Sequence, residues 1–140
     1  MTGIKLSLDD IAFINLFEKT TKASVKDCIV DEQKNKITFV VNEGHIGMAI
    51  GRGGANIKKL EHRMNKKLEV IEFSKDPLKF LTNLLRPIKV KNAYVSERSD
   101  GKKTVYASVM RDRMGMVKTK VKNARNLLEK YYKFDDIIIQ

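Results

Sequence analysis

The sequence predicts an α+β fold made of two copies of one unit, each with the order helix, strand, strand, helix, helix, strand. In each unit the helices are expected to pack on a three-stranded sheet. The first observation is an internal repeat: residues 25–32 read VKDCIVDE and residues 90–97 read VKNAYVSE, with four of the eight positions identical. The second is that helical and strand-like spacing of apolar residues alternates in the same order in both halves. We therefore predict two domains, residues 1–75 and residues 76–140.

The first unit is expected to open with a helix, because Ile11, Ile14 and Phe17 recur at helical spacing. Two strands follow, VKDCIVDEQ and KITFVVNE, and the polar turn between them is typical of a hairpin. A short helix over HIGMAI, a glycine-rich turn and a second helix over ANIKKLEHRMN come next, and KLEVIEF forms the last strand. The only cysteine, Cys28, falls in the first strand, where we expect it to be buried.

The second unit is expected to begin at Asp76, which can cap a helix whose first residue is Pro77. The apolar stripe of that helix consists of Leu78, Leu81, Leu85 and Ile88. The strands KVKNAYVSE and KKTVYASVM flank the turn 99–101. Two helices, over roughly 112–118 and 121–132, and a last strand, DDIIIQ, complete the unit.

The charge of the chain points to a polyanionic partner. It carries 28 Lys and Arg against 17 Asp and Glu, a net charge of +11, and such an excess is most often matched by nucleic acid. A basic surface without a partner is the alternative. No segment approaches the roughly 18 apolar residues of a membrane span, and the N-terminus lacks the pattern of a secretory signal. One cysteine and two histidines without ligand spacing give no metal site, and no set of catalytic residues is evident.

The segment IGRGGANI, residues 50–57, joins the two expected helices of the first unit. Its glycines allow backbone conformations with positive φ and a close approach by another backbone. The N–H groups at the start of the following helix favour a phosphate, and Arg52 adds a charged donor. A dinucleotide-binding loop would need a third glycine at position 56, where Asn stands, and a Walker A loop would need Gly-Lys-Ser/Thr. A plain helix–helix turn is the remaining alternative.

This segment resembles the (I/V)-G-x-x-G-x-x-I signature of KH domains, and the order of elements is similar to the type II form of that fold. The tandem pair resembles that of NusA-like transcription factors, particularly the short archaeal forms. The resemblance implies that the glycine turn clamps the backbone of RNA while bases lie over the apolar groove beside it. The residues expected to bind RNA are Ile50, Gly51, Arg52, Gly53, Gly54, Asn56, Ile57, Lys58, Lys59 and Arg63.

The second unit departs from this pattern, because the repeat places residues 118–121, Lys-Thr-Lys-Val, opposite the glycine turn. Its charge balance is higher, with 15 basic and 7 acidic residues (+8) in 76–140 against 13 and 10 (+3) in 1–75. We expect secondary electrostatic contacts to RNA from Lys118, Lys120, Lys122 and Arg125. The alternative is a support domain whose basic surface binds nothing.

Together these features predict a cytoplasmic, monomeric, non-enzymatic protein that binds single-stranded RNA without a cofactor, a metal or a membrane. The resemblance implies a role in transcription elongation, termination or antitermination, with RNA polymerase or the transcription complex as a further partner. Ribosome assembly or RNA processing is an alternative with the same chemistry. A protein-interaction scaffold with residual RNA binding is an alternative of a different class.

Overall fold

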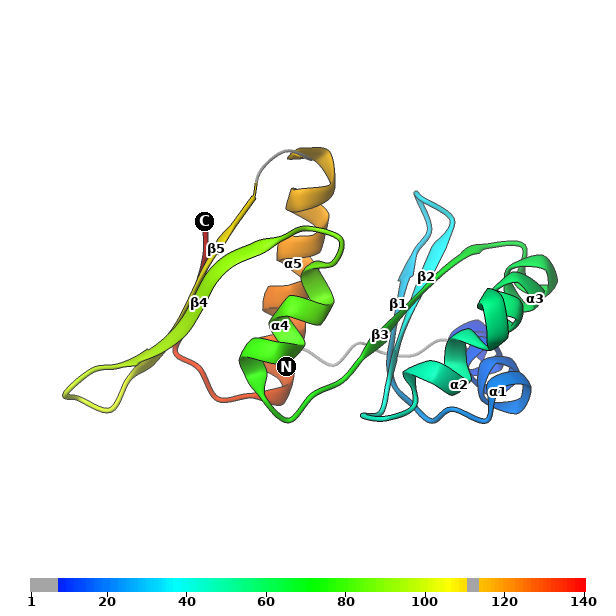
Figure 1. Cartoon of the computed structure of the whole chain (residues 1–140), viewed down its shortest axis with the longest axis horizontal. Coiled ribbons are helices and arrows are strands. Elements are labelled where there is room, and N and C mark those ends of the chain that lie inside the picture. Colours follow the sequence, from blue (N-terminus) through cyan, green and yellow to red (C-terminus); the bar gives the residue numbers. More distant parts are fainter. Residues whose placement is uncertain (1–7, 111–113) are drawn as a thin grey trace. The chain divides into compact units, whose positions relative to one another are not determined.

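The computed structural model describes residues 8–110 and 114–140. The chain divides into two compact units, Met1–Ser74 and Lys75–Gln140. Each unit has its own helices and its own three-stranded sheet, so the predicted α+β class is confirmed (Figure 1).

The first unit follows the predicted order of elements. It contains α1 (Leu8–Thr21), β1 (Val25–Asp31), β2 (Lys36–Val41), α2 (Ile46–Ile50), the single 3-10 turn η1 (Arg52–Gly54), α3 (Ala55–Met64) and β3 (Lys67–Glu72). β2 lies in the middle of the sheet, antiparallel to β1 and parallel to β3. All three helices lie on one side of this sheet, so the turn between α2 and α3 is held by both (Figure 1).

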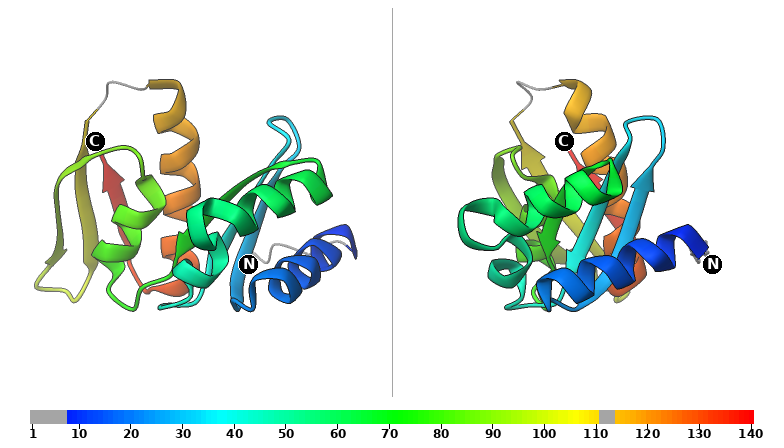
Figure 2. Two further views of the ribbon diagram at one scale, coloured as in Figure 1. Left: turned by 45° about the vertical axis from the view of Figure 1, so that its right-hand side comes forward. Right: turned by 90° about the vertical axis from the view of Figure 1, so that its right-hand side faces the viewer.

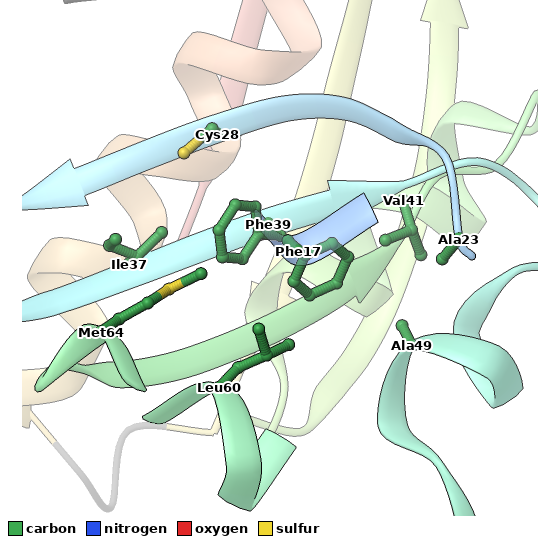
Figure 3. Close-up of a cluster of buried hydrophobic side chains, with 9 residues drawn as sticks. All are labelled: Phe17, Ala23, Cys28, Ile37, Phe39, Val41, Ala49, Leu60 and Met64. Carbon is green, nitrogen blue, oxygen red and sulfur yellow. The ribbon is translucent and has the colours of Figure 1, made fainter. Parts of the chain in front are cut away.

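The core of the first unit joins α1 and α3 to the middle strand. The rings of Phe17 on α1 and Phe39 on β2 stack with centroids 4.2 Å apart, and Leu60 of α3 is buried beside them (Figure 3). Burial of each such side chain stabilises the fold by about 1.5–3 kcal/mol. Cys28 is buried in β1 as predicted, and burial, helped by the carboxylates of Asp10 and Asp27, raises the pKa of its thiol to about 12.

The second unit contains α4 (Pro77–Leu85), β4 (Val90–Glu97), β5 (Lys103–Val109), α5 (Met114–Tyr131) and β6 (Asp136–Ile139). The predicted start of α4 is confirmed, because the side chain of Asp76 accepts a hydrogen bond of 3.0 Å from the Leu78 N–H. α4 and α5 both lie on one side of the sheet (Figure 2).

The repeat in the sequence is also a repeat in the backbone. In the second sheet β5 lies in the middle, antiparallel to β4 and parallel to β6, as β2 does in the first. The first hairpin shifts register between Val25 and Asp27, and the second between Val90 and Asn92, which is the matching place in the repeat. Two short segments with half their residues identical therefore form the same irregular strand.

The prediction of two helices after β5 is wrong in the described residues, because α5 runs without a break from Met114 to Tyr131. The expected start at residue 112 lies outside those residues. A break between helices requires a residue that leaves the helical conformation, which glycine does readily. Residues 118–121 contain no glycine or proline, so the helix continues through them. Its buried face is formed by Val117, Ala124, Leu127 and Leu128.

Candidate nucleic-acid interface

Three glycines shape the turn between α2 and α3, and each has positive φ. Gly51 has φ 77° and ψ 170°, a combination that is essentially restricted to glycine. Gly53 has φ 61° and Gly54 has φ 78°, both in the left-handed region. The backbone therefore favours glycine at all three positions and is essentially restricted to it at Gly51.

The turn is closed by its own hydrogen bonds. The Gly51 N–H donates to Gly47 O over 3.0 Å, and the Gly54 N–H donates to Gly51 O over 3.2 Å. The Ala55 N–H donates to Arg52 O, so this N–H at the start of α3 is already paired, contrary to the expectation that it would be open. The exposed tip of the turn consists of Arg52 and Gly53.

The tip has room for a ligand. A Cβ atom added at Gly53 or Gly54 would have no atom within 4 Å outside the residue itself and its two neighbours in the chain. Glycine is needed there for conformation rather than for packing within the protein. Apart from its chain neighbours Arg52 and Gly54, no residue crowds the backbone on the Cβ side of Gly53.

Asn56 holds the turn from within. Its Nδ2 atom donates a hydrogen bond of 2.8 Å to the carbonyl of Met48, near the end of α2. A Cβ atom at Gly51 would lie 2.9 Å from Cγ of the same side chain. The amide of Asn56 therefore fastens α2 to α3, a role that the sequence pattern did not predict.

Two exposed apolar side chains of α2 precede the turn. Ile50 is 40% exposed and Met48 is 43% exposed, whereas Ala49 between them is buried. Ile50 was predicted as part of the site, but Met48 was not. Because Ala49 faces the core, its helical neighbours Met48 and Ile50 project to either side of it and remain exposed.

α3 separates apolar from charged residues. Leu60 and Met64 are buried and Ile57 is half-buried, whereas Lys58, Lys59 and Arg63 are exposed. No acidic residue lies in the first turn of this helix. Three of the predicted basic residues, Lys58, Lys59 and Arg63, thus lie on the helix that follows the glycine turn, and Arg52 lies in the turn itself.

Hydrogen bonds join the start of α2 to the open end of the β1–β2 hairpin, opposite its turn. His45 precedes the helix, and its Nδ1 atom accepts a hydrogen bond of 2.9 Å from the Ser24 N–H. The Asn42 N–H donates to Ser24 O over 2.9 Å, and the His45 N–H donates to Asn42 O over 3.0 Å. These bonds fix the direction in which α2 delivers the chain to the glycine turn.

All four predicted basic residues of the second unit lie on α5, including Lys118 and Lys120, which the repeat had placed in a turn. Lys118, Lys122 and Arg125 are exposed, but Lys120 is only 7% exposed and belongs to the buried side of the helix. The side chain of Lys120 is therefore too buried to contact RNA from the surface of the helix. Its position opposite a loop in the repeat had made it look equivalent to its neighbours.

The three exposed basic residues of this group border an open pocket of about 300 Å³. Its lining residues are Val117, Lys118, Val121, Lys122, Arg125 and Asn126. Three cations and one amide around a shallow hollow suit an anion such as a phosphate. The second unit thus presents side-chain cations where the first unit has a glycine turn.

Within residues 8–110 and 114–140, no group of three or more His, Cys, Asp or Glu side chains is arranged to hold a metal ion. Among the described helices, none is both long enough and apolar enough to cross a membrane.

A comparison with protein families matches residues 14–100 to the KH domain. The chain belongs to the KH-domain family. The matched segment spans all of the glycine turn, and it extends through β4 of the second unit. Membership of this family supports RNA binding as the activity of the chain.

Relatives in archaea carry one name, "Probable transcription termination protein NusA". The Halococcus morrhuae protein is 32% identical over 140 residues, covering 96% of this KH protein and 98% of the relative. The Halobacterium salinarum protein is 30% identical over 138 residues, covering 96% of each. This KH protein is therefore a member of the short archaeal NusA-like type.

The Methanococcus vannielii relative is 45% identical over 94 residues, which are 67% of this chain but only 53% of the relative. The match thus spans about half the length of that protein. Among solved structures, the crystal structure of APE1850 is 35% identical with a TM-score of 0.70, and the match covers 96% of this chain and 99% of that one.

Proposed function

We propose that this protein binds single-stranded RNA and that the turn Gly51–Gly54 is its principal grip. The observation that carries the proposal is the exposed tip at Arg52 and Gly53, where the backbone is open to a phosphate group. The guanidinium of Arg52 supplies planar donors that match phosphate oxygens. A KH loop of this kind clamps about four nucleotides.

The bases would lie against the exposed apolar side chains beside the turn. Ile50 and Met48 would offer their exposed side chains to the bases, and the exposed Lys58 and Lys59 at the start of α3 would contact the phosphates. Single-stranded RNA fits this arrangement better than a duplex, because the bases must be unpaired to lie on a protein surface.

The second unit would add affinity without reading bases. Lys118, Lys122 and Arg125 border a pocket but no glycine turn accompanies them, so the contact would be to phosphate groups. Binding through side-chain charge alone is largely independent of sequence and sensitive to salt.

In the cell we propose a role in transcription elongation, termination or antitermination, with RNA polymerase or the transcription complex as a partner. The support is the name shared by the relatives that match nearly the whole chain. Copurification tests this assignment: recovery with RNA polymerase supports it, and recovery with ribosomal particles instead would contradict it.

The grip is tested by replacing Arg52 and Gly53 together by Asp, which puts negative charge where the phosphate would sit. We expect the affinity for single-stranded RNA to fall more than about tenfold, since a charge-assisted hydrogen bond contributes about 1.5–3 kcal/mol. Affinity is measured by fluorescence anisotropy of a labelled RNA, and folding by circular dichroism.

The matched control is Asn15→Asp with Lys19→Asp on the exposed surface of α1. This pair changes the net charge by the same amount in the same unit. Equal losses of affinity in the two variants would show that only net charge matters, and they would refute the grip.

A further inference from the structure

The sheet of the second unit has one face without a helix. Val105, Ala107 and Val109 of β5 are buried, and α4 and α5 lie on that side (Figures 1 and 2). Because side chains alternate along a strand, Tyr106 projects from the opposite face. No helix of the described part of this unit covers that face.

Two tyrosines stack on the open face. Tyr94 of β4 is directly paired with Tyr106 of β5, so both side chains project from the same side of the sheet. Their rings are stacked, with centroids 5.2 Å apart and planes inclined by 20°. Tyr94 is 49% exposed. Since Tyr106 backs it, the ring of Tyr94 is held in place and presents aromatic surface to solvent.

The rest of this face is mainly polar. By the same alternation its members are Asn92 and Ser96 on β4, Thr104 and Ser108 on β5, and Asp136 and Ile138 on β6. Hydroxyl and amide groups around a held aromatic ring can donate to and accept from the edges of a base. An apolar protein partner would instead require a contiguous hydrophobic patch, which this composition does not provide.

The hairpin that carries the tyrosines is basic. Residues 89–110 include five basic side chains, namely Lys89, Lys91, Arg98, Lys102 and Lys103, and two acidic ones, Glu97 and Asp100. Asp100 lies 3.6 Å from Arg98 as an ion pair. By the alternation along the strands Lys103 projects from the helix side, so the positive charge beside the open face lies at the ends of the hairpin, at Lys89, Arg98 and Lys102, where it complements a phosphate backbone.

We propose that the open face of β4–β5–β6 is a second RNA-binding surface, on which a base of single-stranded RNA stacks on Tyr94. Aromatic residues on an exposed sheet are an established way to hold unpaired bases, and stacking tolerates any base because every base has a π face. This inference shares its ligand with the proposed function, but it uses a different unit and a different chemistry from the glycine turn.

The protein contains no tryptophan, so Tyr94→Trp introduces a single indole fluorophore at the stacking position. The full-length variant is titrated with a single-stranded RNA of one arbitrarily chosen sequence and about 20 nucleotides, which is much longer than the four nucleotides that one KH loop clamps. We expect saturable quenching of the introduced indole by the single strand and little quenching by a duplex of the same sequence. Fluorescence that stays constant while the RNA binds would overturn the proposal.

A second pair of variants separates stacking from a structural effect. Tyr94→Phe keeps the ring and should bind RNA as the unmodified protein does, whereas Tyr94→Ala should bind about five- to a hundredfold more weakly. Equal affinity of the Ala and Phe variants would also overturn the proposal.

The two proposals fail separately. Arg52→Asp and Gly53→Asp are introduced together into the Tyr94→Trp protein. These changes remove the proposed contact at the glycine turn but leave the open face of β4–β5–β6, here called the platform, unaltered. Quenching that persists at higher RNA concentration supports the platform, and it does so whether or not the glycine turn proves to be the principal grip. A protein that binds RNA through the turn while the indole fluorescence stays unchanged would refute the platform alone.

Discussion

At the scale of single residues, the glycine turn depends on the contact between Gly51 and Asn56. Gly51 adopts a conformation that other residues avoid. The side chain of Asn56 occupies the space that a Cβ atom at position 51 would need. Asn56 in turn reaches the carbonyl of Met48. Any side chain at position 51 therefore strains the backbone and displaces the amide that joins α2 to α3.

We predict that Gly51→Ala lowers the free energy of unfolding by about 1–3 kcal/mol and also weakens RNA binding. Gly47→Ala is the matched control, because Gly47 lies within α2 without positive φ and without a neighbour within 4 Å of its added Cβ. Alanine there should be neutral or stabilising by about 0.5–1 kcal/mol. Thermal unfolding and RNA titration of both variants check this, and identical behaviour of the two would contradict it.

The sequence predicted which residues form the turn, because positive φ and glycine are directly linked. It did not predict that Asn56 would be engaged within the protein or that Met48 would be exposed. Both facts depend on how α2 and α3 meet, and no spacing of residues within one helix contains that information.

At the scale of elements, α5 shows how a repeat can mislead. The alignment carried the break between α2 and α3 over to residues 118–121, but a break follows local backbone preference and not ancestry of the unit. Without glycine the helix continues, and its rotation per residue turns Lys120 inward while Lys118 and Lys122 stay exposed. The tyrosine pair was missed for a related reason, because its pairing depends on strand register.

The pocket on α5 makes a prediction about salt. Replacing Lys118, Lys122 and Arg125 by Gln should reduce the slope of log affinity against log salt concentration by about 0.7 for each phosphate contact that is lost. The control replaces Lys79, Arg86 and Lys133, which are exposed elsewhere in the same unit. The slope is measured by RNA titration at several salt concentrations. A slope that changes equally in both variants would mean that the pocket holds no phosphate.

At the scale of the whole molecule, two units share one topology and differ in chemistry. The repeat, the pairing of strands and the register shifts are common to both. The first unit exposes a glycine turn and two apolar side chains beside it, whereas the second exposes basic side chains on a helix and an aromatic pair on a sheet. Topology was predictable from sequence because apolar spacing specifies it, but the surfaces follow from the packing of each unit.

The most direct test of the central claim is a map of amide chemical shifts during titration of the whole chain with single-stranded RNA. We predict that the largest changes in the first unit cluster at Arg52 and Gly53 and extend to Met48 and Ile50. Changes confined to other surfaces, with the signals of residues 50–54 unmoved at saturation, would contradict the claim that the glycine turn grips the RNA.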